Sequence, residues 1–313
     1  MWWWSLIQNE LRPQLARFQF TLEMEQDITM PQYSGSMLRG AFGHALKKIS
    51  CMTDMPSCTS CPLQQSCHYN SIFEPSPKLG DRYASLPAPF IIEAPFLPRE
   101  CSIKAGQIIK FGMILFGHSM QLFQSIVLAW QRAAFQGLGR QRARARLILV
   151  EQEDEHGFST IFNEHSALIK PLLAPKKLEV FQNLSQISLV FLTPARVKHN
   201  GVYCNGQSIT AESLLNALRR KVNLYNTHYL NLDITSPPSP GHIQLKGELQ
   251  VTPWSRYSSR QKQSIQLDGL LGKVTLRGDL QPWASLLALG EYTHIGKNTS
   301  FGLGQFQLEQ QSL

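Results

Sequence analysis

Apolar and polar residues alternate over positions 15–24 of the chain, in the run Leu-Ala-Arg-Phe-Gln-Phe-Thr-Leu-Glu-Met. A period of two predicts an antiparallel strand that buries one face. From Ser34 or Ser36, either of which can cap a helix, to about Ser50 the apolar residues instead form one helical stripe. The same reasoning predicts the remaining elements of the first half: strands over 90–93 and 108–116, a helix from Ser119 to about Phe135 that Gly137 and Gly139 end, and a strand over 139–150.

A second series of elements follows the segment 151–177 and repeats the order of the first. Strands are predicted over 187–192, 243–252, 269–278 and 305–308, and helices over 210–229 and 282–289. Each half therefore has the β-α-β-β-α-β order of the ferredoxin-like (RRM-like) fold. We predict an α+β protein with tandem ferredoxin-like domains: 1–160, with a cysteine-rich insertion at 51–68, and 180–313, with a glycine-rich loop at 290–304.

The insertion contains four cysteines, Cys51, Cys58, Cys61 and Cys67, and the central pair has CxxC spacing. Four thiolates so close together fit a tetrahedral metal site. We expect a structural zinc ion that pins the insertion rather than one that performs chemistry. An iron–sulfur cluster, which also uses four thiolates, and four free thiols are the alternatives. His68 could replace Cys67 as a ligand.

The net charge favours an anionic partner. Lysine and arginine outnumber the acidic residues 30 to 22, which gives a formal charge of +8. Such a surplus fits nucleic acid first and an anionic membrane second. No run approaches the roughly 18 apolar residues of a membrane helix. The apolar start, residues 1–7, lacks the basic segment and cleavage site of a secretory signal, so we expect a cytoplasmic protein without a membrane partner.

Arginines recur at every second position of the predicted strand 139–150: Arg140, Arg142, Arg144 and Arg146. A strand would place all four on one face. Like charges on one face repel each other unless an anion lies there, so we favour a nucleic-acid contact over a solvated face.

The predicted helix 34–50 carries glycine and cationic residues opposite its apolar stripe: Gly40, Gly43, His44, Lys47 and Lys48. Glycine costs about 1 kcal/mol in a helix interior, so two on one face favour a specific reason. A phosphate backbone could lie close to such a thin, positive face. The alternative is an ordinary solvated surface.

The stretch 290–304 contains four glycines besides His294, Lys297, Thr299 and Ser300. Successive exposed N–H groups next to a lysine and hydroxyl groups could hold phosphate oxygens. The stretch is neither a Walker loop nor a dinucleotide fingerprint, because the required glycine spacing before a helix is missing. A glycine-rich hairpin without a ligand is the alternative.

Several blocks together resemble one family, the CRISPR-associated endoribonucleases of the RAMP superfamily, which cut precursor CRISPR RNA within its repeats. The resembling blocks are Leu38–Leu46, the cysteine cluster, Gly137–Arg140 with the following arginines, Trp254–Arg260, Gly269–Asp279 and Gly290–Phe306. The last block is the most specific. The cysteine cluster and Trp254–Arg260 resemble a subgroup with a distinct C-terminal domain.

The resemblance implies repeat RNA in a basic cleft between two ferredoxin-like domains, and cleavage without a metal or other cofactor. The ribose 2′-OH attacks the adjacent phosphate, which leaves a 2′,3′-cyclic phosphate and a 5′-OH. This chemistry needs a base, a cation and an acid. Family members place a histidine on the first helix, so the resemblance implies catalysis by His44, with Lys47 and the upstream Tyr33. His294 is the second candidate, and its alternative role is to brace the loop.

The RNA would contact residues of both halves. The expected contacts are Arg39, Lys48, Arg140, Arg142, Arg144, Arg146, Arg219, Arg220, Arg256, Arg260, Lys297 and Ser300. The alternative function is a non-catalytic RNA-binding RAMP subunit of a CRISPR effector complex. The sequence leaves open an association with effector subunits, and also whether the protein is a monomer or a homodimer.

Overall fold

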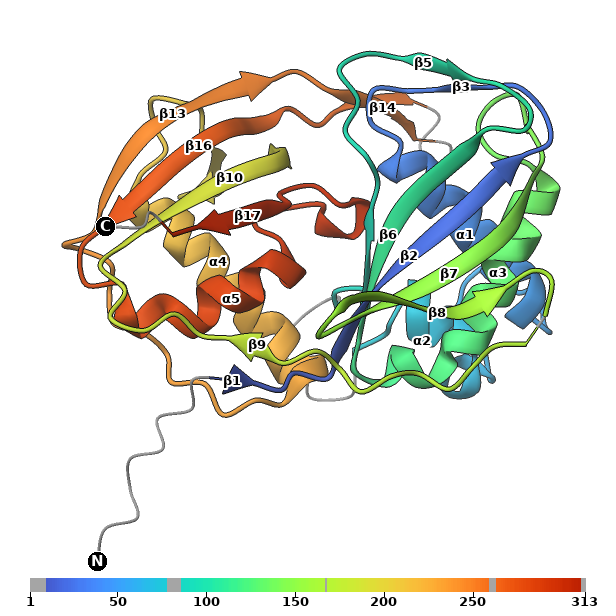
Figure 1. The fold of residues 1–313 in the computed structure, drawn as a ribbon, viewed down its shortest axis with the longest axis horizontal. Helices are drawn as coiled ribbons and strands as arrows, with labels where there is room; N and C mark the ends of the chain where they lie inside the picture. Colours follow the sequence, from blue (N-terminus) through green and yellow to red (C-terminus); the bar gives the residue numbers. More distant parts are fainter. Residues whose placement is uncertain (1–9, 78–85, 167, 259–262, 311–313) are drawn as a thin grey trace, which may run out of the picture. The chain divides into compact units, whose positions relative to one another are not determined.

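A computed structural model describes residues 10–77, 86–166, 168–258 and 263–310 (Figure 1). The chain divides into two compact units. The first unit comprises residues 14–175, and the second comprises 176–313 together with the segment before Gln14. Strand β1 (Glu10–Leu11) pairs with β9 (Leu178–Glu179), which attaches residues 10–13 to the second unit. This differs from the predicted range 1–160, because a two-residue strand is too short for its pattern to reveal a partner far along the chain.

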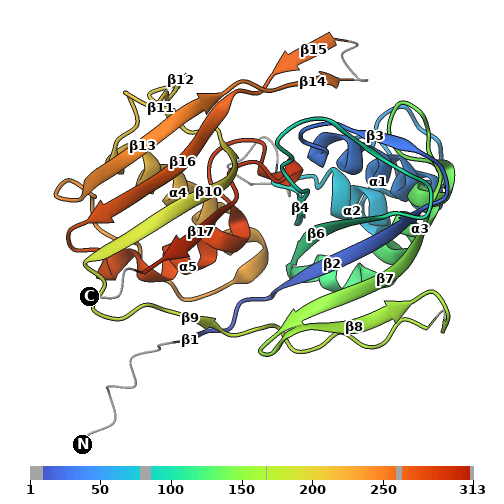
Figure 2. The same cartoon turned by 45° about the horizontal axis from the view of Figure 1, so that its top comes forward.

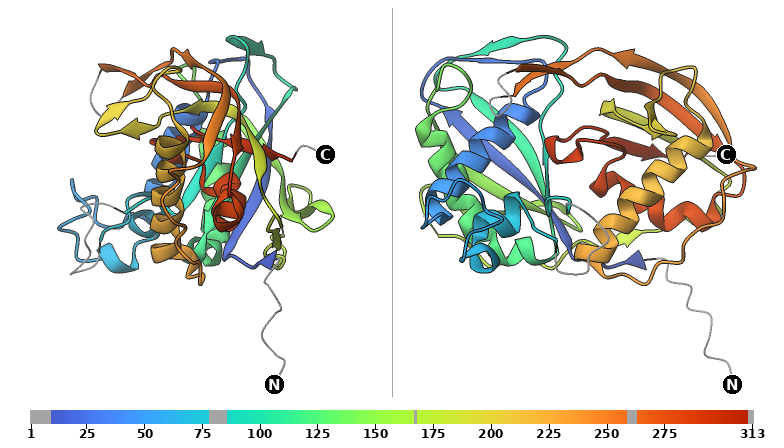
Figure 3. Two further views of the ribbon diagram at one scale, coloured as in Figure 1. Left: turned by 90° about the vertical axis from the view of Figure 1, so that its left-hand side faces the viewer. Right: turned by 180° about the vertical axis from the view of Figure 1, so that it is seen from behind.

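The first unit contains a five-stranded antiparallel sheet with the order β4-β6-β2-β7-β8. Helices α1 and α3 cover one face of this sheet, as the view from behind shows (Figure 3). The elements in chain order are β2 (Leu15–Met24), β3 (Ile28–Met30), α1 (Gly35–Ser50), η1 (Gln64–Ser66), α2 (His68–Phe73), β4 (Phe90–Glu93), β5 (Cys101–Ile103), β6 (Ile108–Phe116), η2 (Gly117–Leu122), α3 (Phe123–Gln136), β7 (Ala145–Asp154) and β8 (Gly157–Asn163).

The second unit contains a four-stranded antiparallel sheet with the order β13-β16-β10-β17, next to helices α4 and α5 (Figure 2). After β9, its elements are β10 (Gln186–Ala195), β11 (Lys198–His199), β12 (Val202–Tyr203), α4 (Ala211–Tyr225), η3 (Asn226–Leu230), β13 (Gln244–Thr252), β14 (Ser255–Ser258), β15 (Gln263–Gln266), β16 (Gly269–Arg277), η4 (Gln281–Trp283), α5 (Ala284–Thr293), η5 (Thr299–Phe301) and β17 (Phe306–Glu309).

Both sheets have the ferredoxin-like strand order. In each, the first and third core strands lie at the centre and the second and fourth lie on either side of them. In the first unit β8 adds a further edge strand beside β7. The predicted α+β class with tandem ferredoxin-like folds is therefore confirmed. Among the described residues, no helix is both long enough and apolar enough to cross a membrane.

The core of the first unit is aromatic. Phe18 and Phe20, alternate residues of β2, have no exposed surface, as the period of two predicts. Trp130 of α3 packs against Phe42 of α1 with ring centroids 5.1 Å apart and against Phe111 of β6 at 4.5 Å. Each fully buried side chain of this size contributes roughly 1.5–3 kcal/mol. These contacts fix α1 on the sheet and determine which of its faces stays in solvent.

Candidate functional site

Helix α1 presents His44 to solvent. Its residues Leu38, Phe42, Ala45 and Leu46 are buried, whereas Gly40, His44 and Lys48 are exposed and Lys47 is half-buried. Lys47 Nζ lies 5.7 Å from the centroid of the Tyr69 ring, next to the inserted helix α2. A histidine and two lysines are therefore accessible on neighbouring turns of one helix, as the sequence predicts.

The two glycines of this helix do not play the same part. Gly40 has open space around it, since a Cβ added there meets no atom within 4 Å. A Cβ added at Gly43 would lie 2.3 Å from Cζ of Phe73, which ends α2. The expectation that both glycines thin an exposed face is wrong for Gly43, because this glycine makes room for an aromatic ring.

Tyr33 and Arg39 face the interior of the first unit. Tyr33 is buried, and burial, followed by the nearby Glu93 carboxylate, raises its pKa well above the usual value. The Arg39 guanidinium stacks over Phe73, 4.1 Å from the ring centroid, and over Phe90 at 5.7 Å. The burial of Tyr33 argues against a direct catalytic role, and Arg39 braces α2 against the sheet.

The predicted arginine strand is wrong in its boundaries. Residues 137–143 form a turn, in which Leu138 bridges Ala143 and Arg142 has a φ of 51°, and β7 begins only at Ala145. The turn is tight, because a Cβ on Gly137 would lie 2.1 Å from the carbonyl oxygen of Arg142. The arginines therefore do not share one strand face.

Carboxylates partner two of these arginines. Arg146 is bound by Glu23 at 2.5 Å and by Glu164 at 2.9 Å, and Arg144 lies 4.0 Å from Glu25. The argument that their charges require an external anion thus fails for this pair. Arg140 and Arg142 are exposed, and no ion pair between described residues includes either of them.

The second histidine, His294, is the residue that ends α5. It has no exposed surface and adopts a φ of 54°, a backbone conformation that a side chain rarely occupies. In this position its ring cannot reach an RNA chain. The burial argues against His294 as a general base and favours the bracing role.

The glycine-rich stretch is folded against its own unit. The N–H groups of Lys297 and Gly304 donate to the carbonyl oxygens of Arg196 and Pro194, both at 3.0 Å. A Cβ on Gly296 would lie 2.4 Å from the Arg196 carbonyl oxygen, so this glycine permits a close backbone contact. These two N–H groups are therefore not available to a phosphate. The Lys297 side chain is exposed and Ser300 is half-buried.

A half-buried lysine contacts this stretch. Lys221 of α4 donates from Nζ to Thr299 Oγ1 at 3.1 Å, and no ion pair between described residues includes it. Burial, and secondly the nearby Lys297 charge, lower its pKa to about 8. Sequence reasoning missed this residue, although helical spacing places it on the same stripe as the buried Leu214, Leu218 and Tyr225.

Two further cations surround an exposed tyrosine on the hairpin β11–β12. Arg196 Cζ lies 4.3 Å and Lys198 Nζ 4.5 Å from the centroid of the Tyr203 ring, which is 42% exposed. Arg196 Nη1 also donates to Asn298 Oδ1 at 2.6 Å, which links the hairpin to the glycine-rich stretch. Sequence reasoning missed this hairpin, although Asn200-Gly201 between its two short strands is a typical hairpin turn.

The remaining predicted contacts differ in exposure. Arg219 is held by Asn216 at 2.6 Å and is half-buried, whereas Arg220 is exposed. Arg256 lies in β14, and Arg260 lies outside the described residues.

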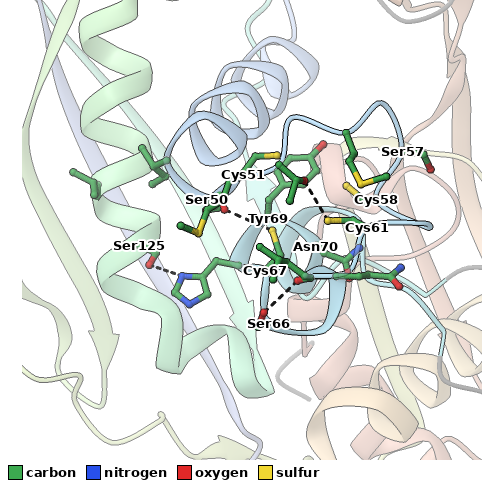
Figure 4. A pocket seen from close by; sticks show the side chains of 18 residues that line it. Ser50, Cys51, Ser57, Cys58, Cys61, Ser66, Cys67, Tyr69, Asn70 and Ser125 are labelled. Atoms are coloured by element: carbon green, nitrogen blue, oxygen red, sulfur yellow. Dashed lines mark hydrogen bonds between the residues drawn. The ribbon is translucent and has the colours of Figure 1, made fainter.

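The four cysteines of the insertion line one cavity of about 460 Å³. Figure 4 shows Cys51, Cys58, Cys61 and Cys67 around it, with Cys67 Sγ 3.9 Å from the Ser50 carbonyl oxygen and Cys61 Sγ 3.3 Å from Thr53 Oγ1. As placed, no three His, Cys, Asp or Glu side chains of the described residues stand in positions that ligate a metal ion. The expected zinc therefore stays a prediction at this point.

Comparisons with known proteins agree with this architecture. The AF_1859_N N-terminal domain family matches residues 11–174, and the family described as CRISPR-associated endoribonuclease Cas6 matches residues 189–306. No curated protein sequence matches the chain.

Solved structures with the same fold are distant in sequence. A Cas6 product complex is 16% identical, with a TM-score of 0.54 over 95% of this chain and 100% of its own. Thermus thermophilus Cas6 is 15% identical, with a TM-score of 0.51 over 96% and 100%. A chain of a partial Cas6-RT-Cas1–Cas2 complex is 12% identical, with a TM-score of 0.55 over 95% of this chain and 46% of its own.

At such identities these structures show the fold alone, so the family is read from the family matches. The two matched segments leave only 175–188 and the ends of the chain uncovered. They fall on the two ferredoxin-like units in turn. The chain therefore belongs to the family with the AF_1859_N N-terminal domain, and its second unit matches the family of CRISPR-associated endoribonucleases described as Cas6.

Proposed function

We propose that this protein binds the repeats of precursor CRISPR RNA and cleaves within them without a catalytic metal. The match of residues 189–306 to the Cas6 endoribonuclease family supports RNA cleavage in CRISPR RNA processing. The observation that carries the mechanism is the exposure of His44 next to Lys47 and Lys48, in contrast to the buried His294. His44 is thus the histidine of the two candidates that an RNA chain can reach.

His44 acts on the attacking oxygen. In its neutral form the imidazole accepts the proton of the ribose 2′-OH, and the 2′ oxygen then bonds to the adjacent phosphorus. The bond from phosphorus to the 5′ oxygen breaks, and that oxygen takes a proton from water, which reaches the exposed helix face. The products are a 2′,3′-cyclic phosphate and a 5′-OH.

The lysines beside His44 stabilise the developing negative charge. Lys48 is exposed and Lys47 is half-buried against Tyr69, so their ammonium groups lie one turn from the histidine along α1. A cation fixed where charge develops is often the largest single contribution to catalysis. We assign this role to Lys47 first, because its contact with the aromatic ring limits the freedom of its side chain.

The RNA backbone is held by the cations without carboxylate partners. In the first unit these are Arg140 and Arg142, whose turn adjoins the start of α1: a Cβ on Gly139 would lie 3.3 Å from Met37 Sδ. In the second unit they are Lys221, Lys297 and Arg220. Tyr203, between two cations and partly exposed, is suited to stack on a base.

The proposal is tested with purified protein and end-labelled repeat RNA in excess EDTA. We expect a single cut whose 5′ fragment ends in a cyclic phosphate. A matched RNA with one 2′-deoxy nucleotide before the cut should bind equally well and stay intact. Tight binding without any product would instead identify a non-catalytic RNA-binding subunit. Cleavage of the 2′-deoxy RNA would exclude attack by the 2′-OH.

A further inference from the structure

The segment 51–67 joins α1 to α2 without burying a single side chain. Each of its residues is exposed or half-buried, and η1 is its one helical turn. A connection of this length with no core of its own is uncommon in a compact domain unless something else orders it. The apolar side chains of the segment do not provide that order, since Met52 is 88% and Leu63 41% exposed.

All four cysteines of the segment are among the side chains that it directs toward one cavity. Cys51, Cys58, Cys61 and Cys67 are all half-buried and line the same cavity, into which their labelled side chains project in Figure 4. The two other cysteines of the chain, Cys101 and Cys204, do not line it. A set of four thiols in one small cavity, with a CxxC pair at its centre, matches the ligand set of closed tetrahedral zinc sites.

The neighbouring histidine is engaged elsewhere. His68 Nδ1 lies 3.0 Å from Ser125 Oγ of α3. This contact turns the ring toward α3, so Cys67 is the better fourth ligand. A site with four thiolates and no open position has a structural role, because it leaves no room for water or substrate on the metal.

We propose that Cys51, Cys58, Cys61 and Cys67 bind one zinc ion that orders the segment 51–67. In the conformation seen, no three of the described His, Cys, Asp or Glu side chains are close enough to ligate a metal, so binding requires the thiols to rotate toward the centre of the cavity. The segment can contract in this way because it has no buried side chain to displace. Zinc binding and local folding are then one step.

The position of the site gives it a consequence for α1. Cys51 is the residue that ends α1, and its N–H donates to the Lys47 carbonyl oxygen at 2.8 Å. Cys67 immediately precedes α2, whose Phe73 fills the space at Gly43. A zinc ion that joins the two cysteines clamps both helices at the end where Lys47 and Lys48 lie.

The test is metal analysis of the full chain purified without chelator. We expect about one zinc per chain, and we expect the double variant Cys58→Ser/Cys61→Ser to lose it. The matched control Cys101→Ser/Cys204→Ser removes two thiols outside the cavity and should retain the zinc. Reconstitution of the stripped protein with cobalt should give intense thiolate-to-metal absorption and the visible bands of a tetrahedral site.

Several results would overturn the proposal. These are wild-type protein without zinc that also gives no tetrahedral cobalt spectrum, iron with acid-labile sulfide in place of zinc, or equal zinc in both double variants. The wild-type measurements decide the matter even where a variant fails to fold.

One further readout rests on the proposed function: zinc-free protein should cleave RNA several-fold more slowly, because α1 is less firmly held. If the wild type binds zinc but cuts no RNA, the proposed function fails and the zinc site stands. If the wild type cuts RNA but binds no zinc, the zinc site fails and the proposed function stands.

Discussion

The two ferredoxin-like units share a topology but present their positive charge in different ways. In residues 14–175 the candidate cations lie on the open face of α1 and on the turn before β7. In residues 176–313 they lie around a glycine-rich stretch, and one of them, Lys221, is half-buried with a pKa that burial lowers to about 8. The same strand order thus supports an exposed helix face with a histidine in one unit and a half-buried lysine beside a glycine-rich stretch in the other.

The units also differ in how their buried or crowded charges are compensated. Arg146 in the first unit has carboxylate oxygens of Glu23 and Glu164 within 2.9 Å. Lys221 in the second unit has only a neutral hydroxyl, that of Thr299, as its described hydrogen-bond partner. A desolvated ammonium without a counter-charge is unfavourable, so an anion that approaches Lys221 is favoured more than one that approaches Arg146.

One feature is common to both units. Gly43 in α1 faces the Phe73 ring, and Gly290 in α5 faces the Phe306 ring, with an added Cβ 2.3 Å and 2.7 Å from the nearest ring atoms. Each of these two helix glycines therefore makes room for an aromatic ring. At these two positions, therefore, the glycine is explained by packing within the unit and not by a ligand.

The largest expected effect separates the two histidines. His44→Ala should slow cleavage by about 10²-fold or more, because a positioned general base contributes roughly that much. RNA affinity and thermal stability should stay close to those of the wild type, since His44 is exposed. Single-turnover cleavage, filter binding and thermal melting measure the three quantities.

His294→Ala is the matched variant in the second unit. Because His294 is fully buried, its removal should lower the free energy of unfolding by more than about 1 kcal/mol. The cleavage rate of the folded fraction should change little. A His294→Ala protein that is stable yet inactive would show that the catalytic histidine is His294 of the second unit and not His44 of the first.

The next effect concerns the helix glycines. Gly43→Ala should destabilise the protein by about 1–3 kcal/mol, because the new methyl group collides with the Phe73 ring. Gly40→Ala, one turn earlier with open space around it, should stabilise it by about 0.5–1 kcal/mol. Denaturant unfolding measures both changes. Equal effects would mean that α2 does not pack on α1 as described.

Much of the fold could be predicted from local pattern. The strand β2 has the bounds 15–24 that its alternation predicts, and α4 begins after Thr210, whose side chain accepts from the Ser213 N–H. The start of β7 could not be found in this way. Arginine tolerates a strand or a turn, and the tight turn depends on the contact of Gly137 with the Arg142 backbone.

The candidate site was harder to predict, since it depends on contacts distant in the sequence. Arg146 is neutralised by Glu23, 123 positions away, and no local period shows such a partner. The burial of His294 likewise depends on packing within the folded unit. Lys221 could have been found, because its spacing from Leu218 and Tyr225 places it on the apolar stripe of α4.

The charge of Lys221 should make RNA binding depend on pH. Burial lowers its pKa to about 8 in the folded protein, below the ordinary value of 10.5, so the free protein loses this positive charge as the pH rises above 8. A bound phosphate favours the protonated form, and RNA affinity should therefore fall about tenfold between about pH 7 and about pH 9. Lys221→Met should bind more weakly at neutral pH and lose most of this dependence.

The lowered pKa of Lys221 should make stability rise with pH, whereas it makes RNA affinity fall. Between about pH 8 and the ordinary lysine pKa the unfolded chain holds a proton that the folded chain has released, so the free energy of unfolding rises with pH in this window. Lys221→Met should remove that rise. A wild-type stability that falls over the window, with the variant unchanged, would show that Lys221 is not desolvated.

The smallest effect compares the arginines that have carboxylate partners with those that have none. Arg140→Ala/Arg142→Ala removes two exposed cations without ion pairs among the described residues, so each lost phosphate contact should lower the slope of log affinity against log salt by about 0.7. Arg144→Ala/Arg146→Ala removes the same formal charge from residues that glutamates already neutralise. That variant should leave the slope nearly unchanged and destabilise the protein slightly.

The two variants are matched in net charge, and therefore a difference in slope reports which arginines touch RNA. Equal slopes would mean that the glutamates release Arg144 and Arg146 when RNA binds. Arginines with and without carboxylate partners would then contribute equally to RNA binding by the first unit.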